Sequence, residues 1–128
     1  MKNVIFTDKA PKAIGPYSQA IEINGMLFIS GQIPIDPATS KITERGIKEQ
    51  TEQVMKNIGA ILAEAGYTYA DVVKSTCLLS DMDNFAAMNE VYSQYFKKGQ
   101  EPARVTIQAL SPINDIDIEI EVTAIVSD

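Results

Sequence analysis

The side-chain groups best suited to chemistry are one guanidinium and a row of carboxylates near the end of this 128-residue chain. Arg104, one of two arginines, follows a Pro-Ala pair, and Asp117, Glu119 and Glu121 come later at every second position. Alternate residues of a strand point to the same face, so an extended chain places the three carboxylates together. Arginine grips a carboxylate ligand through two parallel hydrogen bonds, and a glutamate can act as a general base or hold a water. One interpretation of this pattern is a site where Arg104 grips a carboxylate while Glu119 acts as a base or holds a water.

The strands that carry these groups are predicted to pair with each other. Residues 104–109 and 116–126 form an antiparallel pair across the segment LSPIND if Thr106 lies opposite Glu119. Arg104 then lies opposite Glu121 and diagonal to Glu119, at a spacing of ~7–8 Å that leaves room for a small ligand or a water. The alternative is a cross-strand salt bridge on a solvated face, which stabilises by about 0.2–1 kcal/mol. Residue parity alone leaves both interpretations open.

The residue types that the chain lacks exclude several kinds of site. With no histidine and a single cysteine, Cys77, the sequence has no Ser-His-Asp triad, no Cys-His pair, no histidine-ligated zinc and no CxxC motif. Neither GxGxxG nor GxxxxGKS/T occurs. We therefore expect no metal centre. Catalysis has to use carboxylates, tyrosines, hydroxyls, lysines, Arg104 or bound water.

Composition and charge indicate one acidic globular domain, residues 1–128. The net charge is -6 and the pI is about 4.6, which argues against binding to nucleic acid or to an anionic membrane. No apolar run of 18 residues occurs, and the first residues lack the apolar core of a signal peptide. A single cysteine allows no intrachain disulfide. We expect a cytoplasmic protein.

Hydrophobic periodicity predicts two helices and a set of strands. A hairpin turns at Asn24-Gly25, Gly66 ends the first helix, and Gly99 ends the second. In the last strand, alternate apolar residues from Ile116 to Ala124 face the helices. The predicted order is β-β-α-β-α-β-β, with a further short strand near residues 4–6, helices at 44–65 and 83–98, a strand at 71–80, and a loop at 34–41. Such an order favours an α+β fold with one mixed sheet and both helices on one face.

Six blocks of the sequence together resemble the Rid family, the YjgF-like reactive intermediate deaminases. They are GPYSQA, FISGQIPIDP, NIGAILAEAG, DMDNFAAMNEVYSQYF, PAR and IEIE, which occur in the family's order from about residue 10 to 126. The resemblance implies a chorismate-mutase-like fold and a homotrimer with clefts between subunits. It also implies hydrolysis of enamines and imines such as 2-aminoacrylate or 2-iminopropionate to 2-keto acids and ammonia, without a cofactor.

The resemblance assigns expected roles to individual residues. Arg104 matches the arginine that binds the substrate carboxylate, Glu119 the acidic residue that orients or activates water, and Tyr17 the tyrosine of the cleft. Substrate-binding positions match Ser30, Gly31 and Asn89, together with Thr106 on the polar face. Many members continue PAR with serine and cysteine where this chain has Val105 and Thr106, so no thiol is expected to act and side-chain preference can differ.

Other functions compete with deamination at this stage. The same clefts would bind 2-keto acids in a regulatory trimer that has no significant turnover. RNA cleavage or a chaperone-like role has also been linked with the family, although the charge of -6 disfavours RNA. Chorismate mutase itself shares only the architecture, and one arginine is too few for a dicarboxylate.

Overall fold

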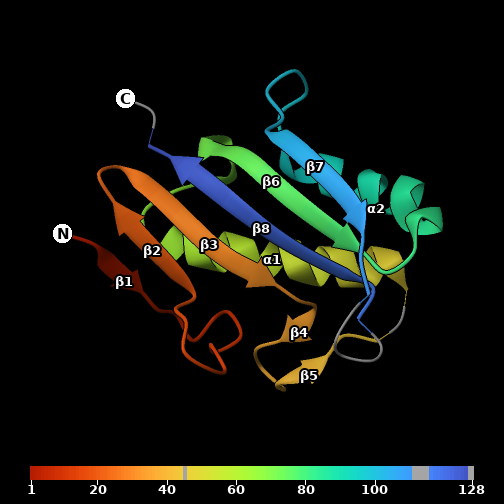
Figure 1. Cartoon of the computed structure of the whole chain (residues 1–128), viewed down its shortest axis with the longest axis horizontal. Coiled ribbons are helices and arrows are strands. Elements are labelled where there is room, and N and C mark those ends of the chain that lie inside the picture. Colours follow the sequence, from red (N-terminus) through yellow and green to blue (C-terminus); the bar gives the residue numbers. More distant parts are fainter. Residues whose placement is uncertain (45, 111–115, 127–128) are drawn as a thin grey trace.

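The computed structural model describes residues 1–44, 46–110 and 116–126. Within them, a six-stranded mixed sheet carries two helices on one face (Figure 1). The strand order is β1-β2-β3-β8-β6-β7, and all neighbours are antiparallel except β6 and β7. The sheet strands are β1 (Asn3–Ile5), β2 (Ala20–Ile23), β3 (Met26–Gln32), β6 (Val72–Leu79), β7 (Ala103–Gln108) and β8 (Ile118–Ile125). The predicted α+β fold is confirmed.

The hairpin between β2 and β3 turns where the sequence predicts. Ile23 pairs with Met26, so Asn24 and Gly25 form a two-residue turn. Both have positive φ angles, 51° and 74°. Two successive positive φ angles match the right-handed twist of the flanking strands, and Asn-Gly is the pair that adopts them at least cost.

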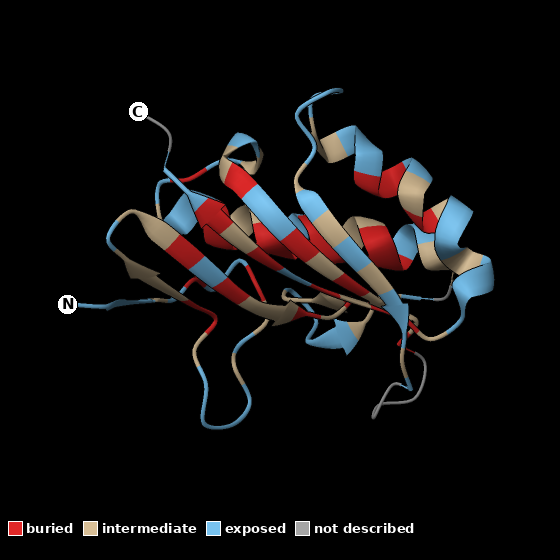
Figure 2. Ribbon diagram, turned by 45° about the horizontal axis from the view of Figure 1, so that its top comes forward, coloured by how far each residue is buried: buried red, intermediate tan, exposed pale blue. Residues whose placement is uncertain are grey.

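The first helix, α1 (Ile47–Glu64), supplies most of the core on the helix side of the sheet. It starts three residues later than predicted, after Gly46, and it ends as expected: Gly66 N–H bonds Ala63 O and Tyr67 N–H bonds Leu62 O. Its buried apolar stripe packs on β8 and β3. Alternating burial along the strands follows from this one-sided cover, as Figure 2 shows.

The second helix is shorter than predicted. Regular α-helix covers only α2 (Phe85–Tyr92), between 3-10 turns at Met82–Asn84 and Ser93–Tyr95. Met88 and Tyr92 are buried, as the aromatic stripe predicted, but Phe85 is exposed at the start of the helix. The predicted loop at 34–41 also contains a small hairpin, β4 (Ile35–Asp36) and β5 (Lys41–Ile42). Within the described residues, no helix is long and apolar enough to cross a membrane.

The opposite face of the sheet has no helical cover among the described residues (Figure 1). Phe28, Val105 and Ile107 stand on it with 41–48% of their surface exposed. Glu119 and Glu121 stand on the same face, because Leu78 pairs with both Glu119 and Ile107 in the register. We call this the outer face. A sheet face that mixes exposed apolar side chains with carboxylates is typical of a surface that another molecule covers.

Candidate active site

The predicted pairing of residues 104–109 with 116–126 is wrong. Strand β7 is the edge strand and pairs in parallel with β6, whereas β8 lies between β3 and β6. Arg104 pairs with Ser75, which in turn pairs with the buried Val122. Arg104 and Thr106 therefore point to the helix side of the sheet, and Glu119 and Glu121 point to the outer face. One chain does not bring the guanidinium and these carboxylates together.

The guanidinium of Arg104 is held by helix α2. Its Nη1 donates a hydrogen bond of 2.8 Å to Asn89 Oδ1. Its carbon atom Cζ lies 4.9 Å from the ring centre of Tyr92 and 5.5 Å from that of Phe85. Within the described part of the chain, Arg104 forms no ion pair, so the cross-strand salt bridge that the sequence left open is also wrong. A hollow of about 400 Å³ beside it is lined by Asn89, Tyr92, Ser93, Glu101, Pro102 and Arg104.

The side chain of Thr106 lies two residues further along β7 and does not line that hollow. Its Oγ1 is buried and makes no hydrogen bond of good geometry, although it lies beside the Cys77 thiol on β6. Burial raises the pKa of this thiol to about 11, against smaller lowering effects from Arg104, Thr106 and Ser75. Cys77 is fully buried and protonated at neutral pH, as expected of a small core residue.

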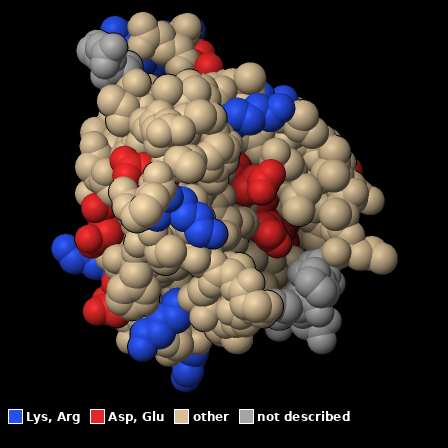
Figure 3. Space-filling model, turned by 60° about the vertical axis from the view of Figure 1, so that its left-hand side comes forward, with Lys and Arg blue, Asp and Glu red and all other residues tan. Residues whose placement is uncertain are grey.

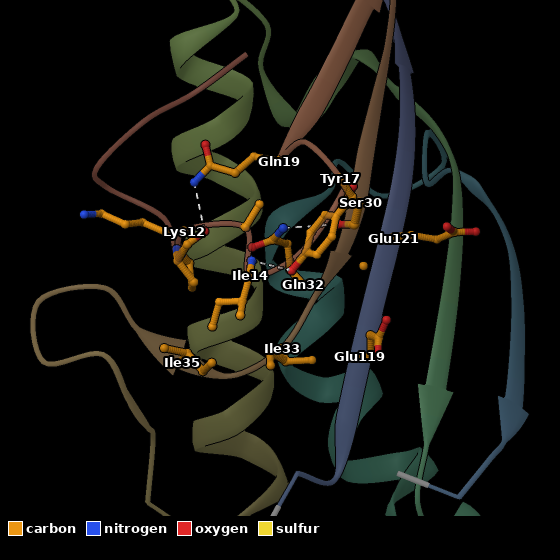
Figure 4. A pocket seen from close by; sticks show the side chains of 13 residues that line it. Lys12, Ile14, Tyr17, Gln19, Ser30, Gln32, Ile33, Ile35, Glu119 and Glu121 are labelled. Carbon is orange, nitrogen blue, oxygen red and sulfur yellow. Dashed lines mark hydrogen bonds between the residues drawn. The ribbon is translucent and has the colours of Figure 1, made fainter. Parts of the chain in front are cut away.

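A second hollow, of about 440 Å³, lies around the end of β3 (Figure 4). Its side chains come from the loop of residues 11–19, from β3 and the residues that follow it, and from β8. Here β3 has a bulge, because Ile29 pairs with Val122 but Gln32 pairs with Ile120. Bulges redirect side chains and are common beside active sites. The predicted residues Tyr17, Ser30, Gly31 and Glu119 all line this hollow.

Gly31 is placed so that Glu119 can lie over it. A Cβ atom at residue 31 would come 2.0 Å from Glu119 Oε2 and 2.9 Å from its Cδ. Any side chain at residue 31 would therefore displace the carboxylate. The position requires glycine for space, since its φ is not positive.

Tyr17 is fixed by the loop on which it stands. Gly15, with a φ of 126°, allows a tight turn in which Tyr17 N–H bonds Gly15 O at 2.9 Å. The Ile14 N–H donates to the Tyr17 hydroxyl at 3.2 Å. Since that oxygen accepts from the backbone, its own proton is left to donate to a ligand. Ser30 Oγ donates to Ser18 O at 2.6 Å and so ties β3 to the same loop.

The carboxylate of Glu119 is less acidic than an ordinary glutamate. Partial burial raises its pKa, and the negative charge of Glu121 two residues away raises it further. No described lysine or arginine forms an ion pair with either side chain. A carboxylate in this state is a better proton acceptor near neutral pH than a solvated glutamate.

Three residues that hold the site side chains in place were missed from the sequence. Gln19 is buried, accepts from Thr7 N–H at 2.8 Å and donates to the carbonyls of Thr7, Ala10 and Pro11. It therefore holds the segment before Tyr17. Phe85 and Tyr92 were assigned only to the core. Phe85, Asn89 and Tyr92 are spaced at i, i+4 and i+7, and this spacing in the sequence indicates that all three share one helix face.

Comparison with known proteins gives the chain close relatives over nearly its full length. Residues 7–126 match the family described as endoribonuclease L-PSP. A RutC family protein of Pyrococcus horikoshii is 56% identical over 124 residues, which cover 97% of this chain and 98% of that protein. The 2-iminobutanoate/2-iminopropanoate deaminase of Mus musculus is 42% identical over 98% of this chain and 92% of its own. The crystal structure of a Rid family protein of unknown function from Yersinia pestis has 47% identity and a TM-score of 0.94, with 98% of this chain and 100% of that one covered.

Proposed function

This chain belongs to the endoribonuclease L-PSP family, also called the Rid, YjgF or RutC family, and from that membership we propose that it is an enamine/imine deaminase. The substrates are 2-imino acids and their enamine tautomers, which water converts to 2-keto acids and ammonia. The observation that carries the proposal is the guanidinium of Arg104, which Asn89 holds and which forms no ion pair among the described residues, together with the raised pKa of Glu119 in a separate hollow.

The substrate is too small to reach both groups within one chain. In a 2-imino acid the carboxylate is bonded directly to the imine carbon, so the groups that bind the one and hydrate the other have to lie close together. Here the sheet separates Arg104 from Glu119. We therefore propose a homotrimer in which the Arg104 hollow of one protomer faces the Glu119 hollow of the next. The exposed apolar residues of the outer face support such a contact. Two different patches that meet head to tail form a closed ring when the rotation between successive protomers closes, one third of a turn for a trimer, and an open filament when it does not.

The proposed reaction needs positioning and one proton shuttle. Arg104 binds the substrate carboxylate through its fork, while Asn89 holds one of its nitrogens. Glu119 takes a proton from a water as that water attacks the imine carbon, and gives it to the nitrogen, which produces a carbinolamine. Glu119 then carries the proton of the new hydroxyl to the nitrogen, so that the C–N bond breaks, ammonia leaves and the keto acid remains. Tyr17 donates a hydrogen bond to the substrate or the water. Uncatalysed imine hydrolysis is already quick, so orientation is enough to supply most of the acceleration.

The first test is an assay of ammonia release from imines that an amino-acid oxidase generates in the same vessel. Arg104→Ala should lower kcat/KM roughly 100-fold or more, because the substrate carboxylate loses its charged partner. Undiminished turnover by this variant would refute the role of Arg104. If the wild type binds 2-ketobutyrate in a calorimeter but releases no ammonia from any imine, the keto-acid-binding regulatory trimer replaces the deaminase.

A second test asks whether two chains share each site. Arg104→Ala and Glu119→Gln should each be inactive alone, but coexpression of both should restore activity. In a random 1:1 mixture, one interface in four has a native Arg104 facing a native Glu119, so about a quarter of the wild-type rate is expected. No recovery in mixed oligomers, verified by mass spectrometry, would place both residues of a site in the same chain.

RNA cleavage receives little support from the surface. The chain carries a net charge of -6, and on the face that Figure 3 draws the basic side chains are separated by acidic and uncharged ones. RNA binding relies on basic surfaces that track the phosphates. Incubation of the purified protein with RNA serves as the control, and cleavage that persists in Arg104→Ala would require a different site.

A further inference from the structure

Helix α2 presents one continuous face to Arg104. Phe85, Asn89 and Tyr92 are spaced at i, i+4 and i+7, and all three contact the guanidinium. Asn89 accepts a hydrogen bond from Nη1, whereas the two rings lie near the guanidinium carbon. The position of this one helix face therefore sets the position of the cation.

Tyr92 differs from Phe85 in being anchored below the surface. Tyr92 is 5% exposed, while Phe85 is 36% exposed. The Tyr92 hydroxyl and Ser75 Oγ form a buried hydrogen bond of 2.6 Å, and Ser75 is fully buried. Ser75 is also the residue that pairs with Arg104 across β6 and β7. The ring is thus attached to the same point of the sheet as the arginine.

The contacts of Phe85, Asn89 and Tyr92 restrict the conformations of the long Arg104 side chain. A free arginine has many rotamers, and ordering it on ligand binding costs conformational entropy. A ring fixed close to its carbon restricts these rotamers and attracts the cation through the ring's electron-rich face. Stacking uses the plane of the guanidinium and leaves its N–H edges for hydrogen bonds, which is where a carboxylate binds.

We infer that Tyr92, anchored on Ser75, is a positioning residue that holds Arg104 in the orientation that binds the substrate carboxylate. The inference rests on the proposed function of Arg104 and extends it to a residue that acts through Arg104. It assigns the hydroxyl of Tyr92 a role in orientation only, since burial raises the pKa of this phenol and keeps it neutral.

The experiment compares graded variants by kinetics and calorimetry. Tyr92→Leu removes the ring and should raise KM for the imine and Kd for 2-ketobutyrate about tenfold, with kcat within about twofold of the wild type. Tyr92→Phe and Ser75→Ala keep a ring but release its anchor, so each should raise both constants about two- to threefold. If Tyr92→Leu fails to fold, these two conservative variants still test the inference.

The matched control is Tyr95, an aromatic residue three positions further along. Its ring packs on Tyr69 and its hydroxyl donates to Glu52 at 2.6 Å, on a part of the core that does not contact Arg104. Tyr95→Phe should lower thermal stability without changing KM or Kd. A merely structural role for Tyr92 predicts the same outcome for both tyrosines.

A double-mutant comparison separates positioning from general damage. In an Arg104→Lys background the planar group is gone, so Tyr92→Leu should weaken 2-ketobutyrate binding by less than twofold. An equal loss in both backgrounds, or an unchanged KM and Kd for Tyr92→Leu, would overturn the inference while leaving the deaminase proposal intact. A wild-type protein with neither turnover nor keto-acid binding would instead overturn the proposed function, and this inference with it.

Discussion

The hollow beside β7 and the hollow around the end of β3 hold their charged groups in different ways. Arg104 is fixed by contacts, since α2 supplies an amide oxygen and two rings to one guanidinium. Glu119 is fixed by space, since its carboxylate occupies the place that a side chain on residue 31 would fill. Glu101 also lines the Arg104 hollow and Lys12 the Glu119 hollow, but among the described residues neither forms an ion pair there. The ion pair that these residues do form joins Lys48 to Glu90 on the surface.

This difference supports the proposal that each hollow is one half of a site. Arg104 and Glu119 are both half-buried and form no ion pair among the described residues, which is costly in a finished structure. Such groups persist where a ligand or a neighbouring molecule completes them. The following substitutions would break or sharpen this contrast, from the largest effect to the smallest.

Gly31→Ala should separate catalysis from stability most clearly. The added methyl group displaces the flexible end of Glu119, so kcat should fall roughly 100-fold while the melting temperature changes little. Gly25→Ala is the matched control, because residue 25 has open space around it but a φ of 74°. It should cost about 1 kcal/mol of stability and keep full kcat. Equal kcat in both variants would show that Glu119 does not need its present position.

Gln19→Leu should weaken the loop that carries Tyr17. The substitution leaves the Thr7 N–H and several carbonyls without their buried partner, at a cost of about 1–3 kcal/mol. Thermal unfolding measures this loss, and Gln94→Leu, at an exposed position, is the control. The Arg104 hollow does not include this loop, so the variant should affect kcat more than binding of 2-ketobutyrate. A melting temperature equal to that of Gln94→Leu would contradict the role given to Gln19.

Glu121→Gln should produce the smallest effect, a shift in the acid limb of the pH–rate profile. The charge of Glu121 helps to raise the pKa of Glu119, so its removal lowers that pKa and moves the limb to lower pH. Folding raises this pKa, so stability from Glu119 is present below its unfolded pKa and is lost as pH rises through the folded value. Glu121→Gln should therefore also stabilise the fold modestly at neutral pH. An acid limb that does not move would mean that another group controls it.

Local patterns in the sequence were sufficient for much of the fold. Asn24-Gly25 predicted the β2–β3 turn, Gly66 predicted the end of α1, and the alternation from Ile116 to Ala124 predicted which side of β8 faces the helices. Each depends on interactions within a few residues or on a period of two. The second helix was predicted too long because its aromatic spacing continues past Tyr92, where the backbone changes to a 3-10 turn.

The pairing of β7 could not be read from alternation. Parity fixes which residues of a strand share a face, but it does not fix which strand lies alongside. The succession strand, helix, strand favours a parallel pair with the helix as crossover, which is how β6, α2 and β7 are arranged. With that pairing, Arg104 moves to the helix side and the predicted contact with Glu121 disappears.

The sequence by itself determined the kinds of group available for chemistry, the family and the local turns, because these follow from residue identity and short-range geometry. Tertiary structure alone decided that Arg104 and Glu119 lie on opposite faces of one sheet, and that α2 rather than a carboxylate holds the guanidinium. The reason is that strand order is set by burying the whole apolar surface at once. Whether two residues distant in sequence become neighbours therefore depends on how the other strands and helices pack, and not only on the elements that carry those two residues.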